Sequence, residues 1–448
     1  MQIAIIGGGL AGMAAALRLA DRGFRPVLFE SRNSLGGRAG YVEEPRAGLA
    51  IDFCQHVALG CCTHFLEFCR RAGIDDALVR HDALHFFGPD GRRFDMRPSA
   101  WLPPKLTMLP SLMQLGYLTW RQRLSVVRAC AAIRRPIAGD RTFSSWLRER
   151  RQHESSVRLF WRPIVESALS DTVDRVSLSA VRQVFVEGLL AGPDASAVYT
   201  MRPSFGWRLG SMRESLCTRG VDVRLRAGMA AITTCRNGAT VHLRNGDSHV
   251  FAAVIVAVPW YRGARLLSRE CPGVAASVGR LEAGAITAVH LWFDRPVTTL
   301  DHGVLPGRLA QWFFCAEGTS PATIGADHYA AADHPAEPLP AEYIQVVVSA
   351  SHAVASEAPL ADRVCGELAE VLPNMRNARL VHSRVLTHRC AVFSPLPGSD
   401  ALRPAQDIGH PRVFLAGDWT ATGWPATMEG AVRSGELAAE AVMRRKLQ

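Results

Sequence analysis

Three glycines near the start of the chain have the spacing of a turn that brings its backbone close to phosphate. Gly7 permits a tight turn, Gly9 lets a pyrophosphate approach the backbone, and Gly12 lets the following helix pack against the preceding strand. The N–H groups at the N-terminal end of the following helix have no intrahelical acceptor and carry the positive end of the helix dipole, so they and the adjoining Leu10 and Ala11 are expected to contact the phosphates. These residue types at this spacing predict a site for a diphosphate.

The elements around the glycines form a strand, a helix and a second strand. The apolar residues 2–6 predict a buried parallel strand, residues 13–22 predict an alanine-rich helix, and residues 26–29 predict the next strand. Glu30 ends the second strand, where a carboxylate accepts hydrogen bonds from the ribose hydroxyls of an adenosine. A glycine-rich structural turn would leave Glu30 and this order of elements unexplained, so the segment predicts a dinucleotide-binding unit.

A second glycine-containing stretch specifies the dinucleotide. Residues 31–38, Ser-Arg-Asn-Ser-Leu-Gly-Gly-Arg, resemble the G-G-R segment of the flavin amine oxidase and phytoene desaturase superfamily. The resemblance implies that the cofactor is FAD, that Gly37 opens the backbone, and that Arg38 lies beside the flavin and the pyrophosphate. It also implies that Ser31 contacts FAD. NAD-dependent dehydrogenases do not need this extension.

The same resemblance implies that the chain returns to this unit twice. In the first return, Asn245-Gly246 is a hairpin turn signal, and Met229 is expected to contact the adenine through its backbone. Strands are predicted at residues 220–225, 228–232, 240–243 and 250–258.

The second return is a strand at residues 413–418 that ends in Gly417 and Asp418. In the superfamily this pair meets the ribityl and pyrophosphate groups. A helix is predicted from Ala426 to the end of the chain, and the N–H groups at its start, at Thr427 and Met428, are expected to point at the C2 carbonyl of the flavin. The positive end of a helix stabilises the negative charge that develops on a reduced flavin.

These segments predict an α/β protein with a Rossmann-like FAD-binding domain and an interleaved substrate domain of mixed sheet and helices. The FAD-binding domain is expected to be discontinuous, at residues 1–60, 205–265 and 403–448. The substrate domain is expected at residues 61–204 and 266–402.

Further segments resemble the squalene-associated FAD desaturases, which are the hydroxysqualene dehydroxylases of hopanoid biosynthesis. The resemblance covers the whole chain, and its residues are 52–57, 59–63, 311–314, 393–404 and 416–435. Two positions depart from the family pattern. Phe53-Cys54 replaces the usual Asn-Gly, and Trp424 stands where a smaller apolar residue is common.

The chemistry implied by this resemblance is reductive: hydroxysqualene loses its allylic hydroxyl group as water and accepts a hydride, which gives squalene. A proton donor must assist the departure of water, and a dry apolar cavity must hold the substrate. Asp52, Gln55 and His56 are the polar residues expected nearest the flavin. His56 is the candidate general acid, because histidine exchanges its proton near neutral pH. The alternative is that Gln55 and His56 only hydrogen-bond the cofactor or the backbone.

Related flavoproteins supply other functions to consider. Flavin amine oxidases use a lysine near flavin N5 and an aromatic cage with a tyrosine. This chain has no lysine between Lys105 and Lys446, and Thr427 stands where the cage tyrosine would be, so amine oxidation is not expected. A carotenoid or other isoprenoid desaturase remains open, as does a non-catalytic flavoprotein partner of a prenyl synthase. Association with squalene synthase-type or prenyl synthase-type enzymes is a further expectation.

The basic charge of the chain favours a lipid surface over nucleic acid. The net charge is +10, carried almost entirely by arginine, without an arginine-rich run or a zinc or helix-turn-helix pattern. No apolar run reaches the roughly 18 residues that span a bilayer. Residues 101–135 combine apolar and basic side chains as an interfacial helix does, although two packed helices with a solvated basic face have the same composition. We expect a cytoplasmic protein, peripheral on the inner face of the cytoplasmic membrane.

The remaining reactive side chains have ordinary explanations. The 11 cysteines include no C-x-x-C pair, and the four between residues 54 and 69 lack metal-site spacing. Buried thiols in a reducing cytoplasm are therefore expected, and no metal. The carboxylates of Glu166, Asp171 and Asp174 are expected to be solvated rather than catalytic.

Overall fold

The computed structural model describes residues 1–44, 49–136, 139–202, 204–315, 342–354 and 359–445. Lys446 and the last residues of the predicted FAD-binding domain lie outside these ranges. Within them, no helix is both long enough and apolar enough to cross a membrane.

A five-stranded parallel sheet joins three distant parts of the chain, in the order β10-β2-β1-β14-β20. β1 (Gln2–Ile6) pairs with β2 (Arg25–Phe29) on one side and with β14 (Ala253–Val256) on the other. β20 (Val413–Leu415) extends the sheet beyond β14, and β10 (Asp222–Arg224) extends it beyond β2. The predicted α/β class is confirmed. The domain boundaries themselves stay a prediction.

Both faces of this sheet are covered, as its continuous apolar strands require. Ile3 and Ile5 of β1 share a core with α1 (Leu10–Ala20), α10 (Leu209–Thr218) and α14 (Met428–Arg444). Ala4 and Ile6 point to the other face, where the antiparallel strands and two helices pack. These elements are β11 (Met229–Cys235), β12 (Gly238–Leu243), β13 (Ser248–Phe251), α11 (Trp260–Leu267) and α12 (Pro272–Val278).

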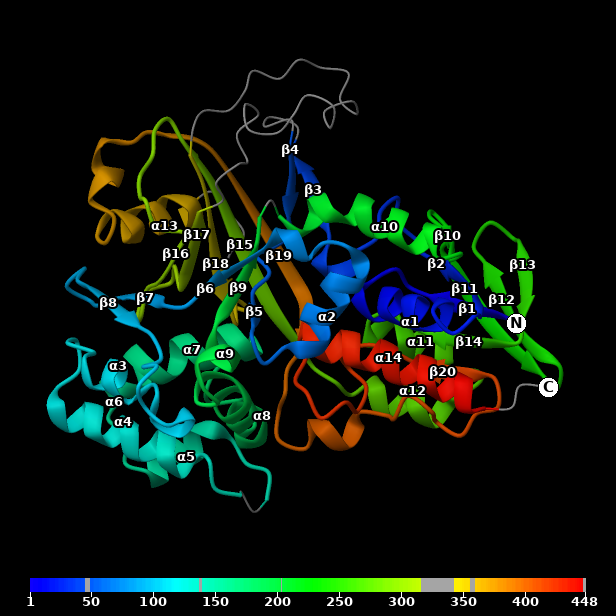
Figure 1. Ribbon diagram of the computed structural model, residues 1–448, viewed down its shortest axis with the longest axis horizontal. Helices are drawn as coiled ribbons and strands as arrows, with labels where there is room; N and C mark the ends of the chain where they lie inside the picture. The colour runs from blue at the N-terminus through cyan, green and yellow to red at the C-terminus, as the bar shows by residue number, and fades with distance from the viewer. Residues whose placement is uncertain (45–48, 137–138, 203, 316–341, 355–358, 446–448) are drawn as a thin grey trace.

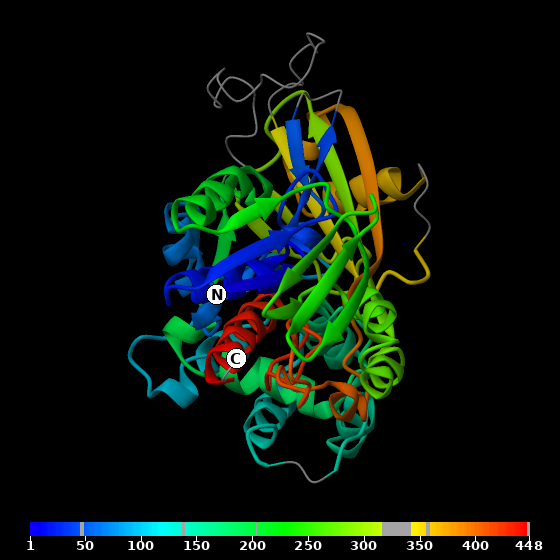
Figure 2. The ribbon, with the colours of Figure 1, turned by 90° about the vertical axis from the view of Figure 1, so that its right-hand side faces the viewer.

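The first and last helices of the chain lie side by side, as both views show (Figures 1 and 2). Gly435 of α14 allows this approach, because a Cβ atom there would lie 2.1 Å from the carbonyl oxygen of Ala11. The N-terminal and C-terminal segments that were predicted to meet at one cofactor are therefore packed together.

Several predicted boundaries are wrong by a few residues. α1 begins at Leu10 rather than Met13, because Gly9 is its N-cap. The single strand predicted at 250–258 is two strands that belong to different sheets, since β13 pairs with β12 and β14 pairs with β1. The last helix begins at Met428 rather than Ala426, with Thr427 as its N-cap.

A seven-stranded mixed sheet forms the second region, in the order β19-β15-β18-β17-β16-β7-β8. β15 (Ala283–Phe293) runs antiparallel to β19 (Leu380–Phe393) and to β18 (Glu342–Ser349). The other strands are β17 (Trp312–Cys315), β16 (His302–Val304), β7 (Leu84–Phe87) and β8 (Arg93–Met96). Two small sheets consist of β3 (Tyr41–Glu44) with β4 (Leu49–Asp52), and of β5 (Ala58–Leu59), β9 (Val198–Met201) and β6 (Leu78–His81).

A layer of short helices lies beside β7 and β8 (Figure 1) and shares one apolar core with β7 and β16. Its helices are η3 (Pro104–Leu106), α3 (Leu109–Met113), α4 (Trp120–Ala132), α5 (Phe143–Glu149), α6 (Glu154–Ser156), α7 (Arg162–Leu169), α8 (Leu178–Gln183), the π-helical η5 (Val184–Leu189) and α9 (Pro193–Ser196). α13 (Pro359–Ala369) packs on β15, and α2 (Thr63–Ala72) packs on α14.

Candidate functional site

The two glycine segments that were predicted separately lie directly on each other. The N–H of Gly36 donates to the carbonyl oxygen of Gly8 at 2.9 Å, and Gly9 forms an isolated bridge with Gly36. Gly37 has φ +59°, and a Cβ atom there would lie 3.1 Å from the Cα atom of Gly9. A side chain at Gly37 would crowd Gly9, and a Cβ atom at Gly8 would lie 2.6 Å from the side chain of Leu35, so these two glycines are needed for the contact itself.

The N-terminus of α1 is open where a phosphate would bind. No side chain among the described residues caps it at Gly9, and a Cβ atom at Gly9 would meet nothing nearer than 4.0 Å. The N–H groups at Leu10 and Ala11 therefore begin the helix without a side-chain acceptor. Gly12 instead provides close packing, since a Cβ atom there would lie 1.9 Å from the carbonyl oxygen of Gly7. This cradle fits the diphosphate of FAD.

Glu30 is buried at the end of β2 and joins the two segments. One of its carboxylate oxygens accepts a hydrogen bond from the N–H of Gly8 at 2.8 Å. The other accepts from the N–H of Arg32 at 2.9 Å and from the hydroxyl of Ser31 at 3.1 Å.

Met229, the predicted adenine contact, is buried at the start of β11, and its carbonyl oxygen accepts from Nε of Arg244 at 3.3 Å.

Arg38 and Asp418 join the N-terminal and C-terminal segments at the site. Nη1 and Nη2 of Arg38 lie 3.0 Å and 2.5 Å from the two carboxylate oxygens of Asp418. Nη1 also donates to the carbonyl oxygen of Ala391 at 3.0 Å, and the guanidinium lies 5.7 Å from the ring centre of Trp260. Burial lowers the pKa of Arg38, but the charge of Asp418 and its hydrogen bonds outweigh burial and raise it. The guanidinium is thus a fixed cation beside the glycine cradle.

The turn after β20 depends on Gly417, which has φ +139°. A Cβ atom at Gly417 would collide with the ring of Trp419, and its N–H donates to the hydroxyl of Ser434 at 2.9 Å. Thr427 then caps α14, because its hydroxyl accepts from the N–H of Gly430 at 3.1 Å. Met428 is the first residue of that helix, so the helix starts at the two residues predicted to face the flavin, although two positions after the predicted start at Ala426.

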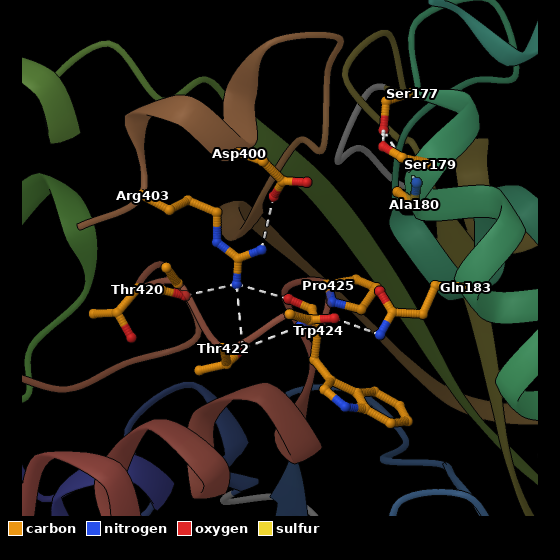
Figure 3. A network of polar contacts seen from close by, with 12 residues as sticks. Ser177, Ser179, Ala180, Gln183, Asp400, Arg403, Thr420, Thr422, Trp424 and Pro425 are labelled. Carbon is orange, nitrogen blue, oxygen red and sulfur yellow. Dashed lines mark hydrogen bonds and ion pairs between the residues drawn. The ribbon is translucent and has the colours of Figure 1, made fainter. Parts of the chain in front are cut away.

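Arg403 holds the loop between Gly417 and Thr427, a role that no local motif in the sequence predicts. Its buried guanidinium donates through Nη2 to the carbonyl oxygens of Thr420 (2.7 Å) and Trp424 (2.6 Å) (Figure 3). The same nitrogen donates to the carbonyl oxygen of Asp418 at 3.1 Å. Nη1 pairs with Asp400 at 2.9 Å. One side chain therefore closes the loop that leads into α14.

The same loop contacts the helical layer. The side-chain amide of Gln183, at the end of α8, donates to the carbonyl oxygen of Gly423 (Figure 3). On the other side, the guanidinium of Arg433 lies 4.6 Å from the ring centre of Trp424. Trp424, one of the two departures from the family pattern, is thus part of the packing that holds this loop.

The three predicted catalytic residues lie together, but Asp52 has a structural task. Its carboxylate accepts hydrogen bonds from the N–H groups of Phe205 (2.8 Å) and Gly206 (2.7 Å) and holds the start of η6 (Phe205–Arg208). His56 has its Nδ1 3.7 Å from an oxygen of Asp52 and is 14% exposed. That Nδ1 has no hydrogen-bond partner among the described residues. The amide of Gln55 is 3.5 Å from the carbonyl oxygen of His56.

Aromatic and polar side chains of β15 and β18 form a wall behind the Asp52 segment. The amide of Gln345 donates to the carbonyl oxygen of Asp52 at 3.4 Å and lies 3.2 Å from Nδ1 of His290. The hydroxyl of Tyr343 is 2.6 Å from the same nitrogen, and its ring centre is 5.0 Å from that of Trp292. Burial lowers the pKa of His290 to about 3, so this imidazole is neutral at working pH.

The expectation that the cysteines are buried thiols is correct for only some of them. Cys69 is buried, whereas Cys54, Cys61 and Cys62 are partly exposed. Burial raises the pKa of Cys54 to about 12, so it is a thiol at neutral pH. No group of three or more histidine, cysteine or carboxylate side chains in the described ranges has an arrangement that could hold a metal ion.

The expectation of solvated carboxylates is wrong for two of the three residues. Asp171 is fully buried, where it accepts from the hydroxyl of Ser394 at 2.6 Å and pairs with Arg175 at 3.1 Å. Burial raises the pKa of Glu166 to about 7. Only Asp174 is exposed. Helix α7 and the turn after it pack against the second sheet, which a composition argument could not show.

Comparisons with known proteins identify the family of the chain. The model of the family described as flavin containing amine oxidoreductase matches residues 10–443. The hydroxysqualene dehydroxylase of Sinorhizobium fredii is 27% identical, over 98% of this chain and 97% of that protein. The zeta-carotene desaturase of Synechocystis is 24% identical, over 99% and 97%. The cyclohexylamine oxidase structure of Brevibacterium oxydans is 17% identical and has a TM-score of 0.70, with 99% and 98% of the chains covered.

The family match spans nearly the whole chain, and the glycine cradle, the Arg38–Asp418 pair and the start of α14 fit its cofactor. The prediction of FAD as cofactor is confirmed. The roles of the individual site residues stay predictions. This chain belongs to the flavin containing amine oxidoreductase family and is an FAD-dependent oxidoreductase.

Proposed function

We propose that the protein removes the allylic hydroxyl group of hydroxysqualene reductively and forms squalene, as in hopanoid biosynthesis. The observation that carries the proposal is the full-length similarity to a hydroxysqualene dehydroxylase. That alignment takes 455 positions for a chain of 448 residues, whereas the alignment to the zeta-carotene desaturase takes 494. Fewer insertions separate this chain from the dehydroxylase, which favours the same substrate class.

In this reaction the C–O bond breaks, a hydride reaches the carbon, and the hydroxyl group leaves as water after it receives a proton. Reduced FAD, when bound, supplies the hydride. His56 is the proposed proton donor, because its partly buried ring has an unpartnered nitrogen. Asp52 lies 3.7 Å from that nitrogen, beyond hydrogen-bond distance, while its own oxygens are held by backbone N–H groups. Gln55 is proposed to hold the adjoining backbone through the carbonyl of His56.

The neighbouring wall supports an apolar substrate. Trp292 and Tyr343 are in van der Waals range of each other, and Trp292 is buried with Ile51 of the Asp52 segment. Neutral His290 adds no charge to this surface. These buried side chains keep water from the side of the Asp52 segment that they cover.

A carotenoid desaturase is the second candidate, favoured by similarity to the zeta-carotene desaturase along 99% of the chain. The FAD-loaded protein should be incubated with hydroxysqualene under a reductant and, separately, with zeta-carotene under an electron acceptor. The proposal predicts squalene in the first reaction and an unchanged carotenoid spectrum in the second. If the carotenoid chromophore lengthens and no squalene forms, the protein is a desaturase and the dehydroxylase proposal is wrong.

A non-catalytic role beside a prenyl synthase predicts a third result, in which neither product forms although FAD is bound. Association with a squalene synthase-type or prenyl synthase-type enzyme remains a separate prediction. Co-purification of the two proteins at equal amounts from one cell extract would support it.

A further inference from the structure

Large apolar side chains are exposed together in one short segment. Trp101 is 96% exposed and Trp120 is 63% exposed, and Leu106 and Met113 between them are also exposed. These four are half of the eight large apolar side chains that are exposed in the described part of the chain. Single exposed apolar side chains are ordinary, but such a concentration marks a surface that contacts an apolar partner. We call the surface of residues 97–123 the apolar tip.

The apolar tip cannot fold its side chains inward, because its inner side is already packed. Its inward residues belong to the core of the helical layer, namely Met108, Leu112, Leu115 and Leu118. Arg123 fixes the turn before α4 by donating to the carbonyl oxygens of Met113 and Leu118, each at 2.8 Å. A capping box between Thr119 and Gln122 fixes the start of α4, so Trp120 is presented on an ordered helix.

The sequence of residues 101–135 had two interpretations, an interfacial helix and two packed helices with a solvated basic face. Residues 101–135 do form packed helices, and their outer side keeps an exposed apolar surface. Two of the basic residues are occupied within the protein. Arg123 serves the turn described above, and Arg134 donates to the carbonyl oxygens of Lys105 (2.8 Å) and Leu190 (2.7 Å).

The chain segment that forms the apolar tip carries charged side chains of one sign. Residues 96–139 contain no aspartate or glutamate, in a chain with 41 such residues. The basic residues of this stretch are Arg97, Lys105, Arg121, Arg123, Arg128, Arg134 and Arg135. The guanidinium of Arg121 lies 5.4 Å from the ring centre of Trp120, so cation and aromatic ring occupy the same place on the surface.

An open hollow of about 610 Å3 adjoins Trp101, with Arg93 and Arg97 at its edge. One carboxylate, Asp95, lies between them at 3.1 Å from each guanidinium and 2.8 Å from His85. Two guanidinium groups against one carboxylate leave a net positive charge. The hollow is thus suited to an anionic group beside an exposed tryptophan.

The geometry points to a bilayer that contains anionic phospholipids as the partner of the apolar tip. Trp101, Leu106, Met113 and Trp120 enter the headgroup region, and Lys105, Arg97 and Arg121 pair with phosphates. The absence of carboxylates from residues 96–139, together with seven basic residues there, favours an anionic lipid surface as the partner. The choice of a lipid partner rests in part on the proposed function, since hydroxysqualene and squalene both partition into lipid.

Vesicle sedimentation tests the inference with the full-length, FAD-loaded protein and no substrate. The protein should bind vesicles of equimolar phosphatidylcholine and phosphatidylglycerol, and bind phosphatidylcholine alone more weakly. The double variant Trp101→Ala/Trp120→Ala should lower the partition coefficient about tenfold. Its matched control, Val250→Ala/Val381→Ala, removes exposed apolar side chains elsewhere and should bind as the unaltered protein does.

A second pair of variants tests how much the basic residues contribute to vesicle binding. Lys105→Gln/Arg121→Gln should reduce binding to the anionic vesicles about tenfold and leave the weaker binding to phosphatidylcholine unchanged. Arg265→Gln/Arg269→Gln removes the same charge from an exposed site outside the apolar tip and should have little effect.

Two results would overturn the inference: no binding to the anionic vesicles, or equal binding by the Trp101→Ala/Trp120→Ala variant. If the apolar tip instead joins two copies of this chain, the double variant would shift the protein to a smaller species in size-exclusion chromatography and vesicles would not bind. Failure of the proposed function is distinguishable, because vesicle binding would persist in a protein that forms no squalene from detergent-solubilised hydroxysqualene.

Discussion

The guanidinium of Arg38 and the carboxylate of Asp418, 380 positions apart in the sequence, form a two-bond ion pair at 3.0 Å and 2.5 Å. The pair lies where the second glycine segment meets the turn after β20. It binds the first and last parts of the chain to one cofactor site.

Removal of either partner should release FAD and destabilise the protein. Asp418 is nearly fully buried, so Arg38→Ala leaves an unpaired carboxylate and should cost roughly 3 kcal/mol of unfolding free energy. Arg38→Ala, Asp418→Asn and the double variant should be compared by urea unfolding and by FAD release. A coupling energy near zero in this cycle would mean that the ion pair contributes nothing.

Gly9 and Gly12 should fail in different ways when each is replaced by alanine. A Cβ atom at Gly9 meets open space, so Gly9→Ala should fold yet lose FAD, because the methyl group occupies the place of the diphosphate. Gly12→Ala should destabilise the fold itself, since its Cβ atom would lie 1.9 Å from a carbonyl oxygen. Gly210→Ala, in open space on α10, is the control. Circular dichroism and bound-flavin absorbance separate the two outcomes; full FAD in Gly9→Ala would refute the assigned diphosphate position.

Arg403→Lys should loosen the loop that leads into α14. Lysine keeps the charge but has a single nitrogen, so it cannot contact the three carbonyl oxygens and the carboxylate of Asp400 at once, as Nη2 and Nη1 of the guanidinium do. We expect FAD to dissociate at least severalfold faster, with a smaller effect for Gln183→Ala, which removes one hydrogen bond to the same loop. Flavin fluorescence after dilution measures the rate. An unchanged rate in Arg403→Lys would show that the loop holds without it.

Glu166 should make stability depend on pH between about 4.5 and 7. Burial raises its pKa to about 7 in the folded protein, so its protonated form is favoured there. Its stabilising contribution is complete below the unfolded pKa and is lost as the pH rises through the folded value, by roughly 2–3 kcal/mol. Glu166→Gln should flatten this decline in unfolding free energy. Asp174→Asn, at an exposed neighbour, should leave it in place; a decline that persists in Glu166→Gln would have another source.

His56→Ala should abolish turnover of hydroxysqualene while FAD remains bound with an unaltered absorbance spectrum. The proposed proton donor would be missing, and general acids contribute roughly 10²–10⁴-fold. Added imidazole should restore part of the rate with a shifted pH profile. His352→Ala, at an exposed site, is the control. Normal turnover by His56→Ala would leave His56 with only its contacts to Asp52 and Phe205.

Local sequence motifs were sufficient to predict the cofactor. The glycine segments, Glu30, Gly417 and Thr427 are signals that operate within a few residues, and the structure has their turns and caps at those positions. The helix starts were misplaced because an N-cap is decided by which backbone groups lack acceptors, a property of the folded turn.

Contacts between segments far apart in the chain could not be predicted from the sequence. Arg403 is one arginine among many, and only the folded loop brings three carbonyl oxygens to its guanidinium. Asp171 is buried because Ser394, more than 200 positions later, supplies a donor. The division of residues 250–258 into two strands depends on separate partners, β12 and β1, which no local apolar pattern specifies.

Anaerobic mixing of photoreduced, FAD-loaded protein with hydroxysqualene is the direct test of the proposed dehydroxylation. We expect the absorbance of oxidised flavin to return and one squalene to form for each flavin reoxidised. A flavin that stays reduced with hydroxysqualene, yet is reoxidised when oxygen is admitted to the same sample, would contradict it.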